Sequence, residues 1–126
     1  PVDHLSGGQR QRAWIAMTLA QQTPVLLLDE PTTFLDLAHQ IEVMELAARL
    51  VRTRKKTIVA VLHDLNQAAR YADHMIMLKG GQVVASAPPR DIMTADTIQA
   101  VFDIRSTIIA DPVTHTPMCI PVPDRF

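Results

Sequence analysis

The sequence has little of what marks several large classes of protein. Its one cysteine, Cys119, cannot form an internal disulfide bond, which is typical of proteins from a reducing compartment. Its 12 Lys and Arg residues are balanced by 13 Asp and Glu residues, so we expect no broad basic surface for a nucleic acid backbone. Aromatic residues make up only 4% of the chain, which argues against a surface on which bases stack. Nucleic acid is therefore not an expected partner.

Long apolar segments are also absent. The longest unbroken apolar run has about five residues, far fewer than a helix needs to cross a membrane. No signal-peptide pattern opens the chain, which begins with Pro1 rather than Met. Apolar residues nevertheless make up 48% of the 126 residues, enough to fill the core of at most one domain. These features together predict a soluble, cytosolic protein.

The first half of the chain contains the signals of a helix and two strands. Ser6 and Gln9 form a capping box, which predicts a helix that starts near Ser6 and stops before Pro24. Residues 25–29 and 57–62 are short apolar runs without alternation, as in parallel strands that are buried on both faces.

A second helix is expected between these two strands. Asp36 is its candidate N-cap, and the basic run 52–56 suits its C-terminus because cations interact favourably with the helix dipole there. The residues that it is predicted to bury are Leu37, Ile41, Met44, Ala48 and Val51. The order strand, helix, strand predicts a parallel βαβ unit.

The second half of the chain contains shorter elements. Residues 65–72 predict a short helix, and Gly80 and Gly81 separate two strand-like runs, which predicts a hairpin. Residues 88–102 predict one or two short helices with Thr94 as a cap, and the Pro-rich tail predicts short edge strands. We therefore expect an α/β fold with a parallel βαβ core, flanking helices and a C-terminal hairpin.

Two glycines follow Ser6 at the start of the first predicted helix. Gly7 and Gly8 carry no β-carbon, so a ligand can approach their backbone closely. The first turn of a helix offers unpaired N–H groups and a positive potential, and the Ser6 hydroxyl adds another donor. This arrangement suits a phosphate group. For the motif in isolation, a capped helix with a tight entry turn is the favoured interpretation.

Acidic and imidazole side chains follow the two predicted strands. Asp29 ends the first strand, where it can hold a hydrated Mg²⁺, and Glu30 beside it can orient a water for attack on a phosphoryl group. If the strands are neighbours, His63 emerges at the same edge and can bind a terminal phosphate and steady Glu30. The alternatives are two acids in an exposed loop and a structural histidine. Metal-ligand spacing is lacking among the other histidines, which are His4, His39, His74 and His115.

Taken in chain order, three motifs resemble the nucleotide-binding domain of an ABC-type ATPase, a P-loop NTPase. LSGGQRQR is similar to the signature motif, LLLDEPTTFLD to the Walker B strand and D-loop, and VLHD to the segment with the switch histidine. The conjunction is highly specific, whereas each piece alone is not. The resemblance covers essentially the whole chain and implies ATP and Mg²⁺ as cofactors.

The resemblance implies a role for individual side chains. Asp29 would hold Mg²⁺ through water, Glu30 would polarise the attacking water, and His63 would be the switch histidine. Asp36 would signal across the interface of a head-to-tail dimer with a second ATPase subunit. The residues that would contact ATP bound to the opposite subunit are Ser6, Gly7, Gly8 and Gln9.

Longer stretches resemble the ATPase subunits of iron–siderophore importers. They are DEPTTFLDLAHQIEVMEL, VAVLHDLNQAARYADHMI and DPVTHTPMCIPV, and haem and cobalamin importer ATPases are close relatives. The resemblance implies a peripheral subunit on the cytoplasmic face of the cell membrane, bound to transmembrane permease subunits. A periplasmic or surface substrate-binding protein would act with it indirectly, and the chain itself would carry no siderophore pocket.

One family motif does not occur in residues 1–126. There is no G-x-x-x-x-G-K-[ST], and the phosphate loop (Walker A), the Q-loop glutamine and the adenine-stacking aromatic would lie upstream of Pro1. Residues 1–126 are therefore expected to be the C-terminal part of an ABC ATPase domain. Alone they are predicted to be inactive, because the P-loop supplies most of the attraction for the nucleotide phosphates. The alternative is a non-catalytic interaction module that donates its signature motif to a partner ATPase.

Overall fold

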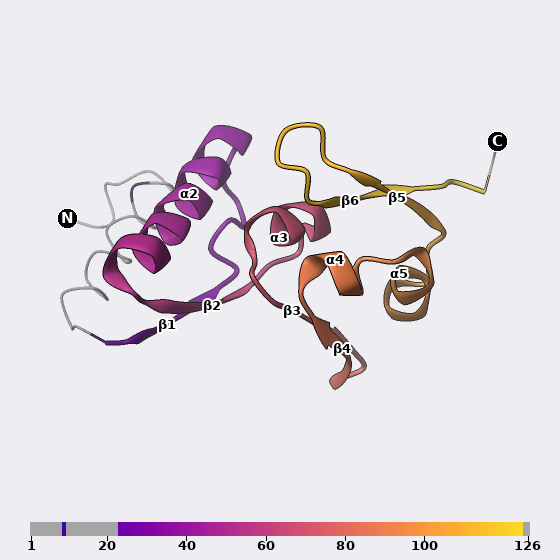
Figure 1. Cartoon of the computed structure of the whole chain (residues 1–126), viewed down its shortest axis with the longest axis horizontal. Helices are drawn as coiled ribbons and strands as arrows, with labels where there is room; N and C mark the ends of the chain where they lie inside the picture. Colours follow the sequence, from indigo (N-terminus) through magenta and orange to yellow (C-terminus); the bar gives the residue numbers. More distant parts are fainter. Residues whose placement is uncertain (1–8, 10–22, 125–126) are drawn as a thin grey trace. The chain divides into compact units, whose positions relative to one another are not determined.

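The computed structural model describes Gln9 and residues 23–124 (Figure 1). The chain divides into two compact units, residues 1–63 and residues 64–126. The helix expected between Ser6 and Pro24 lies outside the described residues, except for Gln9, which is helical and exposed. None of the described helices is both long enough and apolar enough to cross a membrane.

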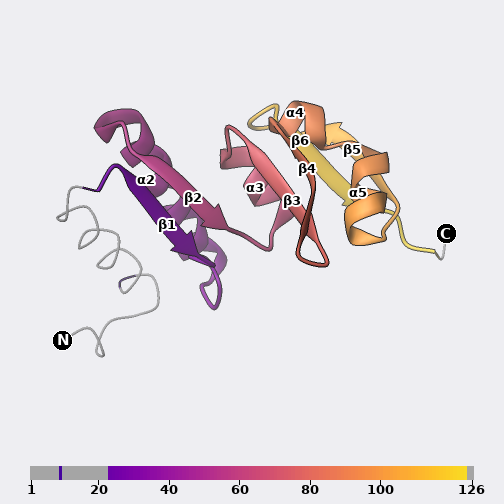
Figure 2. The same cartoon turned by 90° about the horizontal axis from the view of Figure 1, so that it is seen from below.

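The first unit contains the predicted parallel βαβ unit. It consists of β1 (Val25–Asp29), α2 (Leu37–Arg54) and β2 (Thr57–Val61). The two strands pair in parallel along their whole length, from Val25 opposite Thr57 to Asp29 opposite Val61, which confirms the expected pairing. Figure 2 shows β1 and β2 side by side, with α2 packed against one face of the pair.

Helix α2 begins where the sequence predicts, but the set of residues that it buries coincides with the predicted set only at Met44. The N–H of His39 donates to Asp36 Oδ1 at 2.9 Å, so Asp36 is the N-cap. Leu37 and Ile41, expected in the core, are 70% and 39% exposed. The buried residues of the helix are Val43, Met44, Ala47 and Leu50. Val43, Ala47 and Leu50 recur at the same helical spacing as the predicted stripe, so periodicity alone cannot distinguish the two faces.

Strands β1 and β2 bury one face and expose the other. Leu26 and Leu28 of β1 are buried against Val43, Ala47 and Leu50 of α2. The prediction that both faces are buried is therefore wrong for the part of the chain that the structure describes, where α2 covers one face. The apolar residues on the opposite face are 48–68% exposed, and they are Val25, Leu27, Val59 and Val61.

The second unit begins with α3 (Leu65–Tyr71) and a hairpin of β3 (Met75–Lys79) and β4 (Gln82–Ala87). The two strands are antiparallel. Gly80 and Gly81 join them with φ of 57° and 76°, and a two-residue turn with positive φ at both positions suits the twist of a hairpin. The predicted short helix and hairpin are thereby confirmed.

Two short helices and a second hairpin complete this unit. They are α4 (Pro89–Ile92), α5 (Ala95–Phe102), β5 (Ser106–Ala110) and β6 (Pro117–Pro121), and the last two pair antiparallel. Thr94 caps α5 as predicted, because its Oγ1 accepts the N–H of Thr97 at 3.1 Å. The core of the unit consists of Ala69, Met75, Met77, Ile92, Met93, Ile98, Val101 and Cys119.

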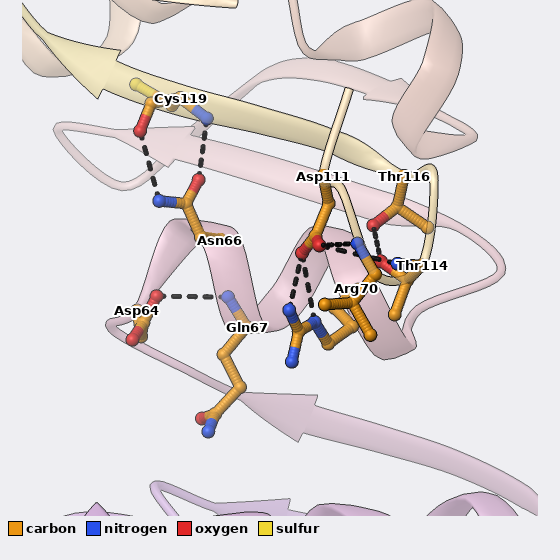
Figure 3. A network of polar contacts seen from close by, with 9 residues as sticks. Asp64, Asn66, Gln67, Arg70, Asp111, Thr114, Thr116 and Cys119 are labelled. Carbon is orange, nitrogen blue, oxygen red and sulfur yellow. Dashed lines mark hydrogen bonds and ion pairs between the residues drawn. The ribbon is translucent and has the colours of Figure 1, made fainter. Parts of the chain in front are cut away.

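Polar contacts tie α3 to the β5–β6 hairpin (Figure 3). Asn66 donates from Nδ2 to the carbonyl oxygen of Cys119 at 3.0 Å and accepts the Cys119 N–H at 2.7 Å. Arg70 donates from Nε and Nη2 to Asp111 Oδ2 at 3.1 and 2.6 Å. The N–H groups of Val113 and Thr114 donate to Asp111 Oδ1. A buried carboxylate thus organises the loop between the two strands.

The acid stability of this unit is expected to depend on Asp111. The hydrogen bond from Arg70, followed by that from the Val113 N–H, lowers the pKa of this carboxyl from 3.8 to about 2. A lowered pKa in the folded state stabilises the fold above the unfolded pKa and ceases to do so as the pH falls through about 2. We therefore expect the urea midpoint to fall between about pH 4 and pH 2, and Asp111→Asn to weaken this dependence. If the urea midpoints of Asp111→Asn and of the unchanged protein depended on pH in the same way, the proposed role of Asp111 would be contradicted.

Candidate functional site

The candidate site lies where the parallel strands β1 and β2 end. Asp29 is the last residue of β1 and pairs with Val61, the last residue of β2. The N–H of Glu30 continues the ladder by donating to the carbonyl oxygen of Val61 at 3.1 Å. His63 follows Val61 by two residues. Glu30 and His63 therefore emerge at the same edge of the strand pair, as the parallel pairing requires.

Glu30 and His63 contact each other directly. His63 Nε2 lies 2.6 Å from Glu30 Oε1, within the range of a short hydrogen bond between an imidazole and a carboxylate. The side chains are 72% and 42% exposed for His63 and Glu30, respectively, so both are accessible to a ligand. When both ring nitrogens carry a proton, Nε2 donates to the Glu30 carboxylate and Nδ1 can donate to an oxyanion, while the carboxylate can still accept a hydrogen bond from a water molecule.

The backbone at Glu30 has an uncommon conformation. Its φ is 52°, in the left-handed region, and Phe34 four residues later has a φ of 65°. Non-glycine residues with positive φ are uncommon, and such strain is often found at functional sites. Turn hydrogen bonds from the N–H of Thr33 to the Glu30 carbonyl and from the N–H of Leu35 to the Thr32 carbonyl hold the loop. The loop thereby begins directly after Asp29, the last residue of β1.

Asp29 offers a carboxylate beside this pair. It is exposed, and hard oxygen donors of this kind suit Mg²⁺. Among residues 23–124 and Gln9, no group of three or more His, Cys, Asp or Glu residues could hold a metal by itself. Mg²⁺ is commonly bound through one or two carboxylates together with water and substrate phosphates. The donor set at Asp29 and Glu30 fits that mode of binding.

Asp36 lies at the other end of the same loop. Besides capping α2, its Oδ1 lies 2.8 Å from His39 Nδ1, and its side chain is 66% exposed. Sequence reasoning placed His39 among histidines without a site. The three-residue spacing between Asp36 and His39 is the signal that could have indicated this contact.

The structure places only part of the predicted site. It brings Asp29, Glu30 and His63 together at one edge, and it places Asp36 on the exposed loop that follows. Gln9 is helical and exposed. The other residues predicted to contact ATP lie outside the described residues, and they are Ser6, Gly7 and Gly8.

Comparison with known proteins identifies several similar chains. The profile of a family described as "ABC transporter" matches residues 1–33. The ferric enterobactin transport ATP-binding protein of Escherichia coli is 56% identical over 121 residues, which are 96% of this chain and 45% of that protein. The achromobactin transport ATP-binding protein of Dickeya dadantii is 59% identical over the same shares. A cobalamin import ATP-binding protein of Halobacterium salinarum is 46% identical over 98% of this chain and 31% of that protein.

The similar solved structures also include ABC transporter and ATP-binding cassette chains. A chain described as an inward-facing transporter of the metal-chelate ABC type superimposes with a TM-score of 0.85 at 30% identity, over 96% of this chain and 49% of that one. A dimeric, post-hydrolysis ATP-binding cassette bound to ADP and Pi has a TM-score of 0.59 at 41% identity, over 68% of this chain and 37% of that one. The chain thus spans less than half the length of the curated relatives that it matches.

Proposed function

Because this chain belongs, over the part it spans, to the family of ABC transporter ATP-binding proteins, we propose that it serves in an ATP-hydrolysing subunit that powers the import of iron–siderophore complexes. The observation that carries the catalytic part of this proposal is the contact of 2.6 Å between His63 Nε2 and Glu30 Oε1 at the carboxyl end of paired parallel strands. The whole of residues 1–126 would form part of one nucleotide-binding domain.

Glu30 is the proposed general base. Its carboxylate is accessible and can accept a proton from the water that attacks the γ-phosphorus of ATP. His63 holds this carboxylate through Nε2, and in the imidazolium form its Nδ1–H can donate to an oxygen of the γ-phosphate. The bond that forms joins the water oxygen to the γ-phosphorus, and the bond that breaks joins this phosphorus to the β–γ bridging oxygen of ATP, which leaves as part of ADP.

Asp29 is the proposed carboxylate for the cation. Bound Mg²⁺ would neutralise charge on the β- and γ-phosphates. Asp29 would hold its hydration shell, since an exposed carboxylate at the strand end suits an outer-shell contact. The phosphates would need further donors, because residues 1–126 contain no G-x-x-x-x-G-K-[ST] sequence.

A second ATPase subunit is the proposed partner at the nucleotide. Ser6, Gly7, Gly8 and Gln9 would contact ATP held by that subunit, because glycines and a helix start suit phosphate oxygens. Asp36 would reach the same interface, and its exposure of 66% leaves it accessible. A dimeric ATP-binding cassette among the similar structures supports this arrangement.

Iron–siderophore complexes are the proposed cargo class. The two most similar relatives named above are ATP-binding proteins for enterobactin and achromobactin, at 56% and 59% identity, against 46% for the cobalamin protein. The subunit would bind transmembrane permeases on the cytoplasmic face of the membrane, and a substrate-binding protein would deliver the cargo to those permeases. Haem and cobalamin are the alternative cargoes.

Uptake by a reconstituted transporter tests this function. The whole protein, assembled with its permeases in lipid vesicles, is expected to import a ferric siderophore only when MgATP is present on the ATPase side. Cobalamin and haem supplied in the same assay are expected to give no accumulation above vesicles without ATP. Import of cobalamin or haem in preference to ferric siderophores would contradict the proposed cargo class. Absence of ATP hydrolysis would contradict the proposed ATPase activity.

A non-catalytic interaction module is the second candidate. In that case the whole protein would lack its own P-loop and would donate residues 6–9 to a partner that has one. The rate of ATP hydrolysis by the whole protein, purified without a partner ATPase, distinguishes the two candidate functions. Only the ATPase subunit would hydrolyse ATP under these conditions.

A further inference from the structure

A histidine outside the proposed nucleotide site contacts the carboxylate that we assign to the dimer interface. His39 Nδ1 lies 2.8 Å from Asp36 Oδ1, and the backbone N–H of His39 donates to the same oxygen at 2.9 Å. Asp36 therefore has two contacts with one residue, a hydrogen bond from the backbone and an ion pair with the side chain. Only the imidazole can be removed by substitution, so its effect can be separated from the cap of α2.

A neighbouring side chain holds the same junction. Gln40 Nε2 donates to the carbonyl oxygen of Leu35 at 2.9 Å. His39 and Gln40 of α2 thus contact Asp36 and Leu35, the last two residues before the helix. Both contacts of His39 with Asp36, the backbone hydrogen bond and the ion pair, are made to Oδ1, while the Asp36 side chain is 66% exposed, so Oδ2 can accept a hydrogen bond from a partner.

We propose that His39 is a positioning residue, which holds the Asp36 carboxylate in the orientation that engages the second ATPase subunit. The inference rests on the proposed function, since it requires an ATP-dependent dimer. Without the imidazole, Asp36 can still cap α2, but its carboxylate must be ordered when the dimer forms, and this ordering opposes association. Exposed ion pairs contribute little to folding, so the effect belongs to dimer formation rather than to unfolding.

Two substitutions at one position test the imidazole. The ATPase rate of the whole protein, purified without permeases, is measured against protein concentration at saturating MgATP. His39→Leu is expected to raise the concentration for half-maximal activity about two- to fivefold, the range of an exposed ion pair. His39→Asn is expected to restore the concentration of the unchanged protein, because its amide nitrogen can take the place of Nδ1 beside Asp36 Oδ1 and donate to it. The urea midpoints of both variants should match the unchanged protein, since the backbone N–H at position 39 still caps α2.

A double-mutant cycle shows whether His39 acts through Asp36. Asp36→Ser removes the carboxylate and keeps a good N-cap, so the helix start is preserved. In this background, His39→Leu is expected to have no further effect. The inference is overturned if His39→Leu acts equally in both backgrounds, if it has no effect in the unchanged protein, or if His39→Asn fails to restore association. An unchanged protein without ATPase activity would instead overturn the proposed function on which the inference rests.

Discussion

The Glu30→Gln variant is expected to turn over ATP about 10²–10⁴-fold more slowly than the unchanged protein, the range associated with loss of a general base. The amide cannot accept a proton from the attacking water. Its oxygen can still accept the hydrogen bond from His63 Nε2, which lies 2.6 Å from the carboxylate, so the geometry of the loop should persist. Phosphate release from the whole protein measures turnover, and size-exclusion chromatography with MgATP should show dimers that no longer separate.

Glu45→Gln is the matched control for this prediction. It makes the same chemical change on an exposed position of α2, away from the end of β1, and should leave turnover unchanged. A Glu30→Gln protein with near-normal turnover would show that another group accepts the proton. A variant that loses both turnover and MgATP binding would show that Glu30 acts on the nucleotide itself rather than on the water.

Substitution of two adjacent leucines of β1 by alanine should change the free energy of unfolding by very different amounts. Leu26 is 0% exposed and packs against α2, whereas Leu27 is 68% exposed on the opposite face. Leu26→Ala should lower the free energy of unfolding by about 2–5 kcal/mol, the range for loss of a buried leucine side chain. Leu27→Ala in the 126-residue chain should stay within about 0.5 kcal/mol, as for a surface position. Urea unfolding of the two variants, followed by circular dichroism, measures both changes.

The same pair of variants also probes the whole protein. Both substitutions remove identical atoms from neighbouring positions, so the difference between them reports on the two faces of β1. If Leu27→Ala becomes costly only in the whole protein, another part of that protein covers the exposed face. If it is as costly as Leu26→Ala in the 126-residue chain, the exposed position of Leu27 is contradicted.

Local chemistry explains why much of the fold could be predicted from the sequence. Gly80 and Gly81 predict the β3–β4 turn because glycine adopts positive φ without strain. Asp36 and Thr94 predict two helix starts because each side chain accepts an N–H three residues later. The parallel pairing of β1 and β2 follows from two apolar runs on either side of a helix. Each of these signals acts over a few residues.

Tertiary contacts decide what the sequence could not predict. The buried face of α2 depends on which residues meet Leu26 and Leu28, and two stripes of the chain have suitable spacing. The shared edge of Glu30 and His63 was predictable once the strands paired. Their contact of 2.6 Å also accompanies a φ of 52° at Glu30, which no feature of the DEPTT sequence indicates. Interactions across the chain therefore set the fine geometry of the site.

The amide of Asn66 has a consequence for the outer edge of the β5–β6 hairpin. It uses both the N–H and the carbonyl group of Cys119, which in an antiparallel strand point to the same side, here away from β5. An extended peptide that added to this edge could not pair with the backbone of Cys119, because the Asn66 side chain already makes the two hydrogen bonds that a neighbouring strand would make. The Asn66 side chain therefore opposes the addition of a strand from another molecule at the middle of β6, and such strand addition is a common route to fibrils.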